Sequence, residues 1–278
     1  MPPGSRGSSG SIAPHPCPAA HAGSRHRPPS RSCWTWSRRR AVSGRVQAGS
    51  ASAPPQALRT SVRQATAFRL QPWTVLDAGC GAGYLLRYLH ARHPDVRFSG
   101  IDRQQNLVAI ASADTELNLH ASSFDEVKFN DSFDLIISDF GWDNQDIPTS
   151  SKPHSSAEIA GARYCPGCSD DQVPFFLALL AQFKRWLNED GQIAIVGRFP
   201  HFGFIRALYI AAERCELRVR PGGFEVLKVK TEAGTERFPA FLLTNSAAKS
   251  ESLKLESIAV AYSGNSRASE FAAHIGEA

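Results

Sequence analysis

The chain has 278 residues, of which 42% are hydrophobic, and this is enough for one sizeable core. Its formal net charge is +5, but residues 1–74 hold 11 Arg and no acidic residue, which leaves 20 basic against 26 acidic residues in 75–278. The charge of the globular part therefore gives no support to nucleic-acid binding, although it does not exclude a groove that follows phosphates.

Residues 1–57 are rich in Ser, Pro, Gly, Ala and Arg and are predicted to form a disordered leader, because they cannot bury enough apolar surface to offset the entropy of ordering. An Arg-rich, acid-free stretch is typical of an organelle transit peptide, whereas a misplaced start codon would produce the same composition. No apolar run approaches the roughly 20 residues of a membrane span, and six scattered cysteines indicate no disulfide framework. We expect a cytoplasmic protein without membrane contact, or an organelle protein if the leader is a transit peptide.

Strands and helices alternate from residue 74 onward. Strands are predicted at 74–79, 96–102, 117–122, 132–140 and 191–197, and helices at 84–93, 105–113, 173–187 and 203–215. Two further strands, 224–231 and 236–244, flank a hairpin turn. The pattern predicts an α/β fold, a doubly wound and mostly parallel seven-stranded sheet with a C-terminal antiparallel hairpin. We expect this domain to span residues 58–245, followed by a tail, 246–278, in which 253–263 suits a strand or a helix.

The stretch VLDAGCGAGYL, residues 75–85, follows the first predicted strand and contains three closely spaced glycines. Glycine lets a ligand approach the backbone because no Cβ intervenes. A dinucleotide loop, G-x-G-x-x-G counted from Gly79, would require a third glycine where Tyr84 stands. Asp77 is also awkward beside a pyrophosphate and suits a ligand with a cationic amino group. A nicotinamide-dependent reductase is thereby disfavoured.

This stretch resembles motif I of the class I S-adenosylmethionine-dependent methyltransferases, and the resemblance extends over residues 73–244. It implies S-adenosyl-L-methionine as the cofactor, held at the first glycine turn and at an acid that closes the second strand and accepts hydrogen bonds from the ribose hydroxyls. The residues at these positions are Asp77, Gly79, Gly81, Gly83 and Asp102.

The loop after the third predicted strand departs from the family pattern. The family has an acid there that hydrogen-bonds the adenine amino group, whereas this chain has Ser123. The resemblance implies that Ser123 accepts a hydrogen bond from the adenine and that Phe124 covers it.

Two residues are candidates for chemistry at the acceptor. Asp139 ends the fourth predicted strand in the stretch DFGW, where amino-group methyltransferases have a polar residue, two prolines and an aromatic residue. Trp142 occupies the aromatic position, but core packing is an equally simple explanation for it. His201 follows the fifth strand and suits a base or a residue that orients the acceptor, with a plain surface histidine as the alternative.

Residues 141–172 are predicted to form a long polar connection, and connections of this length are often functional. It contains His154 and the pair Cys165 and Cys168. A single C-x-x-C is weak evidence for zinc, because a structural site needs about four ligands and the other candidates lack the usual spacing. A redox pair and an inert loop are the alternatives, and we expect no metal.

The sequence therefore predicts a methyltransferase that acts on a small-molecule acceptor. An RNA or protein N-methyltransferase is the second possibility, and a catalytically silent, cofactor-binding partner protein is the third. The absent adenine-loop acid and the incomplete acceptor motif keep the third alternative open. The identity of the acceptor and the oligomeric state are not encoded in any recognisable motif.

Overall fold

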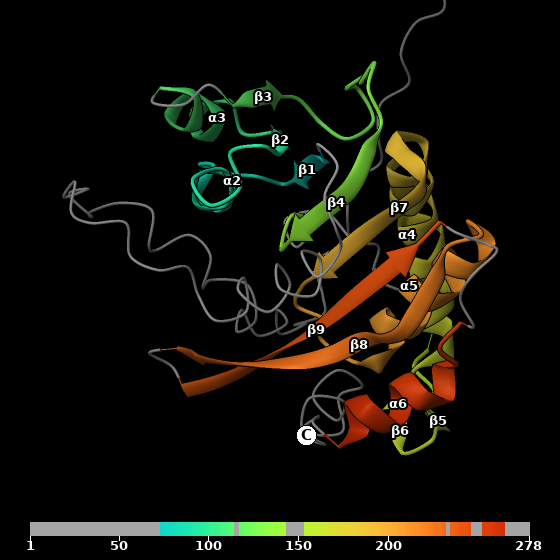
Figure 1. Ribbon diagram of the computed structural model, residues 1–278. Helices are drawn as coiled ribbons and strands as arrows, with labels where there is room; N and C mark the ends of the chain where they lie inside the picture. The colour runs from blue at the N-terminus through green and yellow to red at the C-terminus, as the bar shows by residue number, and fades with distance from the viewer. Residues whose placement is uncertain (1–72, 114–116, 143–152, 232–233, 246–251, 265–278) are drawn as a thin grey trace, which may run out of the picture. The chain divides into compact units, whose positions relative to one another are not determined.

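A seven-stranded sheet forms the centre of the fold (Figure 1). The structure is a computed structural model that describes residues 73–113, 117–142, 153–231, 234–245 and 252–264. The strand order is β3-β2-β1-β4-β7-β9-β8. The strands are β1 (Thr74–Ala78), β2 (Arg97–Asp102), β3 (Asn118–Ala121), β4 (Phe133–Asp139), β7 (Leu187–Val196), β8 (Arg218–Thr231) and β9 (Gly234–Thr244).

Five neighbouring strands, from β3 to β7, run parallel, and the last two pair antiparallel. Asp77 in β1 lies between Gly100 of β2 and Ile137 of β4 in the register. The parallel strands therefore end at one common edge, and the residues that follow them meet there. The predicted fold class, including the antiparallel hairpin, is confirmed.

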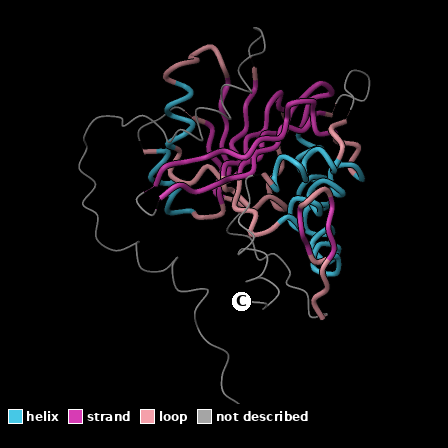
Figure 2. Tube along the Cα trace, turned by 90° about the horizontal axis from the view of Figure 1, so that it is seen from below, coloured by secondary structure: helices cyan, strands magenta, loops and turns pink. Residues whose placement is uncertain are grey.

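Helices cover both faces of the sheet (Figure 2). The first two helices connect β1 to β2 and β2 to β3, and the next two flank β7 in the chain. Parallel neighbours need such a crossover connection, because the chain must return to the edge of the sheet where the previous strand began. The helices are α2 (Tyr84–His90), α3 (Gln105–Ser112), α4 (Pro166–Trp186), α5 (Phe202–Arg214) and α6 (Leu255–Ser263).

Alternation along β1 divides the apolar side chains between two cores, because successive residues of a strand point to opposite faces. Val75 packs with Leu85, Leu86 and Leu89 of α2. Leu76 belongs to the larger core on the other face, which includes most of the buried side chains of α4 and α5. Burying each such side chain contributes about 1.5–3 kcal/mol, so the sheet is anchored from both sides.

The connection between β4 and β7 is more ordered than the sequence predicted. α4 begins at Pro166 rather than at 173, and β5 (Ala157–Ile159) and β6 (Ala162–Tyr164) form a small antiparallel hairpin before it. Proline suits the first position of a helix because its missing N–H has no partner there in any case. The predicted connection, 141–172, therefore contains a hairpin and the first turns of α4, while 143–152 lie outside the described residues.

The C-terminal region resolves one open alternative, since 253–263 form mainly a helix, α6. The predicted leader, 1–57, lies outside the described residues, as does most of the rest of the predicted tail. Within the described part of the chain, no helix combines the length and the apolar character that crossing a bilayer requires.

Candidate active site

A cavity of about 580 Å³ lies where the parallel strands end. Gly79 follows β1, Asp102 ends β2, the segment 122–125 follows β3, and Gly141 follows β4, and all of them line the cavity. Ligands of open α/β sheets bind at this carboxyl edge. The cavity therefore occupies the position that the sequence predicted for a nucleoside.

The glycine loop adopts a backbone conformation that favours glycine at all three positions. The φ angles of Gly79, Gly81 and Gly83 are +95°, +52° and +70°. A Cβ on Gly79 would lie 2.2 Å from the Cα of Gly141, and a Cβ on Gly141 would lie 1.9 Å from the carbonyl oxygen of Ala78. The ends of β1 and β4 are thus in direct backbone contact, which explains the glycine in DFGW, a residue that the sequence analysis did not single out.

Asp102 is fixed by the glycine loop itself. The N–H of Gly81 donates to its Oδ2 at 2.9 Å, and the N–H of Gln104 donates to its Oδ1 at 2.8 Å. A carboxylate offers about four acceptor positions, so two remain for a ligand. The carboxylate is therefore held in place at the cavity wall with capacity for a vicinal diol.

Asp77, in β1, is only 2% exposed and is not among the residues that line the cavity. Its burial raises the pKa of the carboxyl well above the usual value, and the negative charges of Asp139 and then Asp102 raise it further. The same causes, burial first and then Asp77 and Asp102, raise the pKa of the neighbouring Cys80 thiol to about 12. Three carboxyl groups from β1, β2 and β4 thus create a negative potential at the glycine loop, which favours a cationic ligand.

The segment 122–125, which follows β3, includes an acidic side chain that lines the cavity. Asp125 lines the cavity two residues after Ser123, and a hydrogen bond with the Ser123 side chain is the main cause that lowers the pKa of its carboxyl. Ser123 also donates from its hydroxyl to Glu126 at 2.8 Å. The ring of Phe124 packs edge-on against Phe183, with 5.5 Å between the centroids. The contacts of Ser123 and Phe124 with an adenine stay a prediction, and Asp125 adds an acidic side chain to the same segment of the cavity wall.

α4 supplies the remaining wall, which the sequence analysis missed. The lining side chains recur at helical spacing and so form one stripe of the helix. A signal was present, since Gln182 lies among apolar positions of this stripe and is itself only 8% exposed. The lining residues of α4 are Phe175, Ala178, Leu179, Gln182 and Arg185.

The end of β4 directs its aromatic side chains away from the cavity. Phe140 has a φ of +56°, which is unusual for a residue with a side chain, and its ring packs against Phe238 of β9. Trp142 is 1% exposed and packs against Phe176 and Phe199. Core packing, rather than stacking on an acceptor, therefore explains Trp142. Asp139 lies close enough to Asp77 for their charges to interact.

His201 caps α5. Its Nδ1 accepts a hydrogen bond from the N–H of Gly203 at 3.1 Å, and the side chain is 1% exposed. The alternative of a surface histidine is therefore wrong. A role for His201 at the acceptor stays a prediction.

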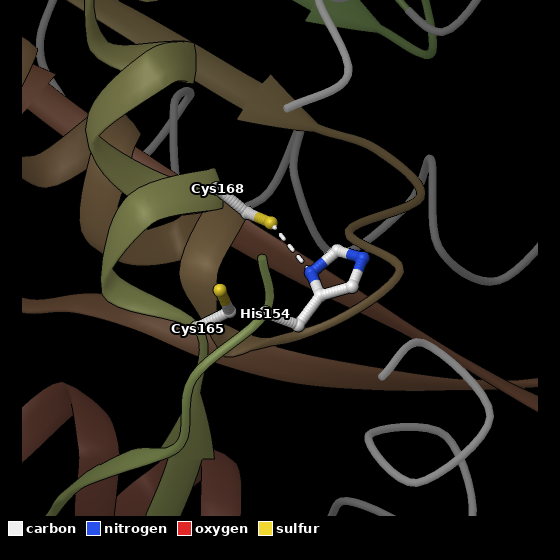
Figure 3. A group of neighbouring side chains, drawn as sticks. All are labelled: His154, Cys165 and Cys168. Carbon is white, nitrogen blue, oxygen red and sulfur yellow. Dashed lines mark hydrogen bonds between the residues drawn. The ribbon is translucent and has the colours of Figure 1, made fainter. Parts of the chain in front are cut away.

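A second group of chemically active side chains lies at the start of α4 (Figure 3). His154 Nδ1 is 3.1 Å from Cys168 Sγ, and Cys165 Sγ lies within 4.8 Å of both atoms. Burial tends to raise the pKa of the Cys165 thiol, but hydrogen bonds involving the backbone of Cys168 and Ser155 and the side chains of His154 and Cys168 outweigh it and lower the pKa to about 6. From the sequence we expected no metal here, because His154 and the C-x-x-C do not have the spacing that is usual for zinc ligands.

Comparisons with known proteins agree with this geometry over the first part of the domain. Residues 75–153 match the family model described as a methyltransferase domain. The malonyl-[acyl-carrier protein] O-methyltransferase of Acetivibrio thermocellus is 37% identical over 75 residues, which are 25% of this chain and 26% of that protein. The enzyme of the same name from Anoxybacillus flavithermus is 30% identical over 76 residues, which are 26% of this chain and 29% of that protein. The chain thus matches little more than a quarter of the length of these curated relatives.

Two solved structures are similar to this chain at low sequence identity. The plantazolicin methyltransferase BpumL, in complex with a pentazolic analogue and SAH, is 15% identical with a TM-score of 0.45, covering 68% of this chain and 82% of that one. A geranyl diphosphate methyltransferase in complex with GPP and sinefungin is 10% identical with a TM-score of 0.45, covering 68% of this chain and 76% of that one. Residues 75–153 are thus similar to a methyltransferase domain, in agreement with the resemblance noted in the sequence.

Proposed function

We propose that the chain transfers a methyl group from S-adenosyl-L-methionine to a small-molecule acceptor. The observation that carries the proposal is the group of three carboxyl groups around a glycine loop at the sheet edge. When bound, the cofactor supplies a methyl group already activated on a sulfonium. A cation of this kind suits the negative charges of Asp139 and Asp102, which add to the effect of burial in raising the pKa of Asp77.

Each predicted cofactor residue has a distinct task in this proposal. Asp102 holds the ribose hydroxyls with the acceptor positions that the loop leaves open. Gly79, Gly81 and Gly83 let the backbone approach the ligand, and Asp77 favours its positive charge. At the far end, Asp125 and Ser123 accept hydrogen bonds from the adenine, and Phe124 covers its face.

The protein's main contribution to the reaction is alignment of the acceptor with the carbon–sulfur bond. Such positioning can supply about 7–11 kcal/mol of the barrier. Asp139 is the proposed acceptor-side polar group because it ends β4 and its charge interacts with that of Asp77. His201, at the N-cap of α5 after β7, is the proposed orienting residue. A general base is needed only if the acceptor carries a proton that must leave early.

A small acceptor is favoured by charge. Residues 75–278 hold more acidic than basic residues, which disfavours a polyanionic acceptor such as RNA. Both curated relatives are named for an O-methyl transfer to a malonyl group on a carrier protein. A carboxyl or hydroxyl group of a small molecule is consistent with that chemistry.

Isothermal titration of the full chain with S-adenosylhomocysteine tests the cofactor site. Replacing Asp102 with Ala removes two charge-assisted hydrogen bonds to the ligand, so we expect the Kd to rise about 30- to 100-fold. Asp95→Ala is the matched control, because Asp95 is exposed and precedes β2 at the opposite edge of the sheet. Absence of heat with the unaltered chain would refute the proposal.

The acceptor class is tested separately. Cell extract is split into RNA, protein and metabolite fractions and incubated with the chain and methyl-labelled cofactor. We expect label in the metabolite fraction. Label confined to RNA or protein would replace the small-molecule acceptor with that class, and binding of the cofactor without label in any fraction would favour the silent partner protein.

A further inference from the structure

The group at the start of α4 lies outside the cofactor cavity, since none of its three members lines that cavity. We propose that His154, Cys165 and Cys168 form a binding site for a thiophilic divalent cation, zinc above all, with three protein ligands and a fourth position open to solvent. This inference is independent of the proposed methyl transfer.

The hairpin β5–β6 explains how residues far apart in the sequence come together. Ala157 pairs with Tyr164 in its register, so the residues before β5 return beside those after β6. The turn at Ala160 and Gly161 has positive φ at both positions, 47° and 84°, as a tight two-residue hairpin turn requires. His154 is thereby brought to the C-x-x-C, even though the linear spacing resembles no zinc motif.

The distances suit a tetrahedral ion. Zinc binds sulfur at about 2.3 Å and imidazole nitrogen at about 2.0–2.1 Å, which places tetrahedral ligand atoms about 3.5–3.8 Å apart. The three ligand atoms lie within 4.8 Å of one another, and the nitrogen and the Cys168 sulfur are 3.1 Å apart. Small side-chain rotations bring these atoms to the required separations.

The scaffold beneath these ligands is firmly held. Tyr164, at the end of β6, is buried against Phe202 of α5, and the Arg206 guanidinium lies over its ring. Arg206 also donates to Ser169 at 3.0 Å, directly after Cys168. The hydroxyl of Ser263 in α6 donates to the carbonyl oxygen of Ala160 at the hairpin turn. A preorganised set of ligands reduces the entropy lost when a metal binds.

The ligand atoms, two cysteine sulfurs and one histidine nitrogen, determine which ions can bind. Two sulfurs and one imidazole favour zinc and exclude magnesium and calcium, which prefer oxygen ligands. The cysteines bind metal as thiolates, and Cys165 lies at the N-cap of α4, where the helix dipole favours that form. Two thiolates and one divalent cation are jointly neutral, so their burial does not leave a net charge.

The surroundings argue against a reactive redox pair. Both cysteines are buried, with 0% and 2% exposure, and they are not joined in a disulfide. His154, in contrast, belongs to an exposed segment, 153–156. Solvent therefore reaches the histidine side of the site, which is where a water or an added ligand would complete the coordination.

Cobalt titration of the reduced full chain tests the site, because thiolate-bound cobalt absorbs strongly and zinc displaces it. We expect saturation at one cobalt per chain, loss of the absorption on adding zinc, and one zinc per chain by elemental analysis. His154→Ala and Cys168→Ser should each weaken cobalt binding at least tenfold, because a three-ligand site loses one of its donors. Cys215→Ser is the matched control, since Cys215 is also buried but lies at the end of α5.

Folding of each variant is checked by circular dichroism. Because the His154 side chain is exposed, its variant keeps the test informative if the cysteine variants fail to fold. An unaltered chain that shows no thiolate–cobalt absorption and retains no zinc would overturn the proposal. So would a Cys165–Cys168 disulfide, seen by intact mass, in a chain that binds no metal after reduction.

Discussion

The two sides of the sheet edge are built in different ways. On the β1–β3 side, each lining residue ends its strand or follows within a few residues, as Gly79, Asp102 and Ser123 do. On the β4–β7 side, the cavity wall comes from α4. The group of His154, Cys165 and Cys168 lies outside the cavity and is brought together by the β5–β6 hairpin, which places His154 beside Cys168. The comparison shows that the residues of the β1–β3 side can be found from local sequence patterns, whereas those of the β4–β7 side come together only through tertiary packing.

The two sides meet at a pair of glycines, and breaking that contact has the largest expected effect. Gly141→Ala places a Cβ 1.9 Å from the carbonyl oxygen of Ala78, so we expect the free energy of unfolding to fall by about 3 kcal/mol or more. Chemical denaturation measures this change. Gly167→Ala is the control, because its Cβ would meet nothing within 4 Å. Equal stability of the two variants would show that the backbones are not in contact.

The negative potential of the β1–β3 side is tested by Asp77→Asn. Neutralising Asp77 should raise the Kd of S-adenosylmethionine about tenfold. The Kd of S-adenosylhomocysteine should rise less, because its sulfur carries no positive charge. Both values are measured by isothermal titration. An equal change for both ligands would mean that Asp77 acts through the shape of the loop rather than through its charge.

The same variant has a pH signature. Because the folded-state pKa of Asp77 is raised above its usual value of 3.8, its contribution to stability is fully present below that pH and is lost as the pH rises toward the folded value. Asp77→Asn removes this loss, so we expect the free energy of unfolding at neutral pH to rise relative to the unaltered chain. Denaturation at pH 4 and pH 7 checks the sign, and a variant destabilised at pH 7 would contradict it.

The end of the β3 loop is tested by Asp125→Asn. The asparagine keeps an acceptor oxygen but loses the charge, so we expect the Kd of S-adenosylhomocysteine to rise about fivefold to tenfold. Asp131→Asn provides the control, because Asp131 is also exposed but does not line the cavity. Unchanged affinity in the Asp125 variant would leave Ser123 as the polar contact of this loop.

The smallest expected change in ligand affinity is for substitutions in the part of α4 that lines the cavity. Gln182 lines the cavity and Gln172 does not, although both are buried on the same helix. Gln182→Ala should raise the Kd of S-adenosylhomocysteine about threefold to fivefold through the loss of one neutral hydrogen bond, while Gln172→Ala leaves it unchanged. If the two variants behave alike, α4 supports the fold without contacting the ligand.

These tests separate features that the sequence encoded from features that it did not. The glycine loop, the acid that ends β2, and the alternation of strands and helices were predictable because they depend on short-range patterns: side-chain alternation, helical period and glycine spacing. Asp125 was missed because a turn brings it into the cavity. Gly141 was missed because its partner, Gly79, is distant in sequence and the contact is between backbones.

The amino-acid sequence by itself determined the α/β fold and the position of the cofactor loop, since local hydrophobic period fixes which face of each element is buried. Only the tertiary structure decided that Trp142 packs in the core, that His201 caps a helix, and that His154 lies beside the two cysteines. The physical reason is that these arrangements depend on which elements pack together, and such contacts leave no periodic signal along the chain.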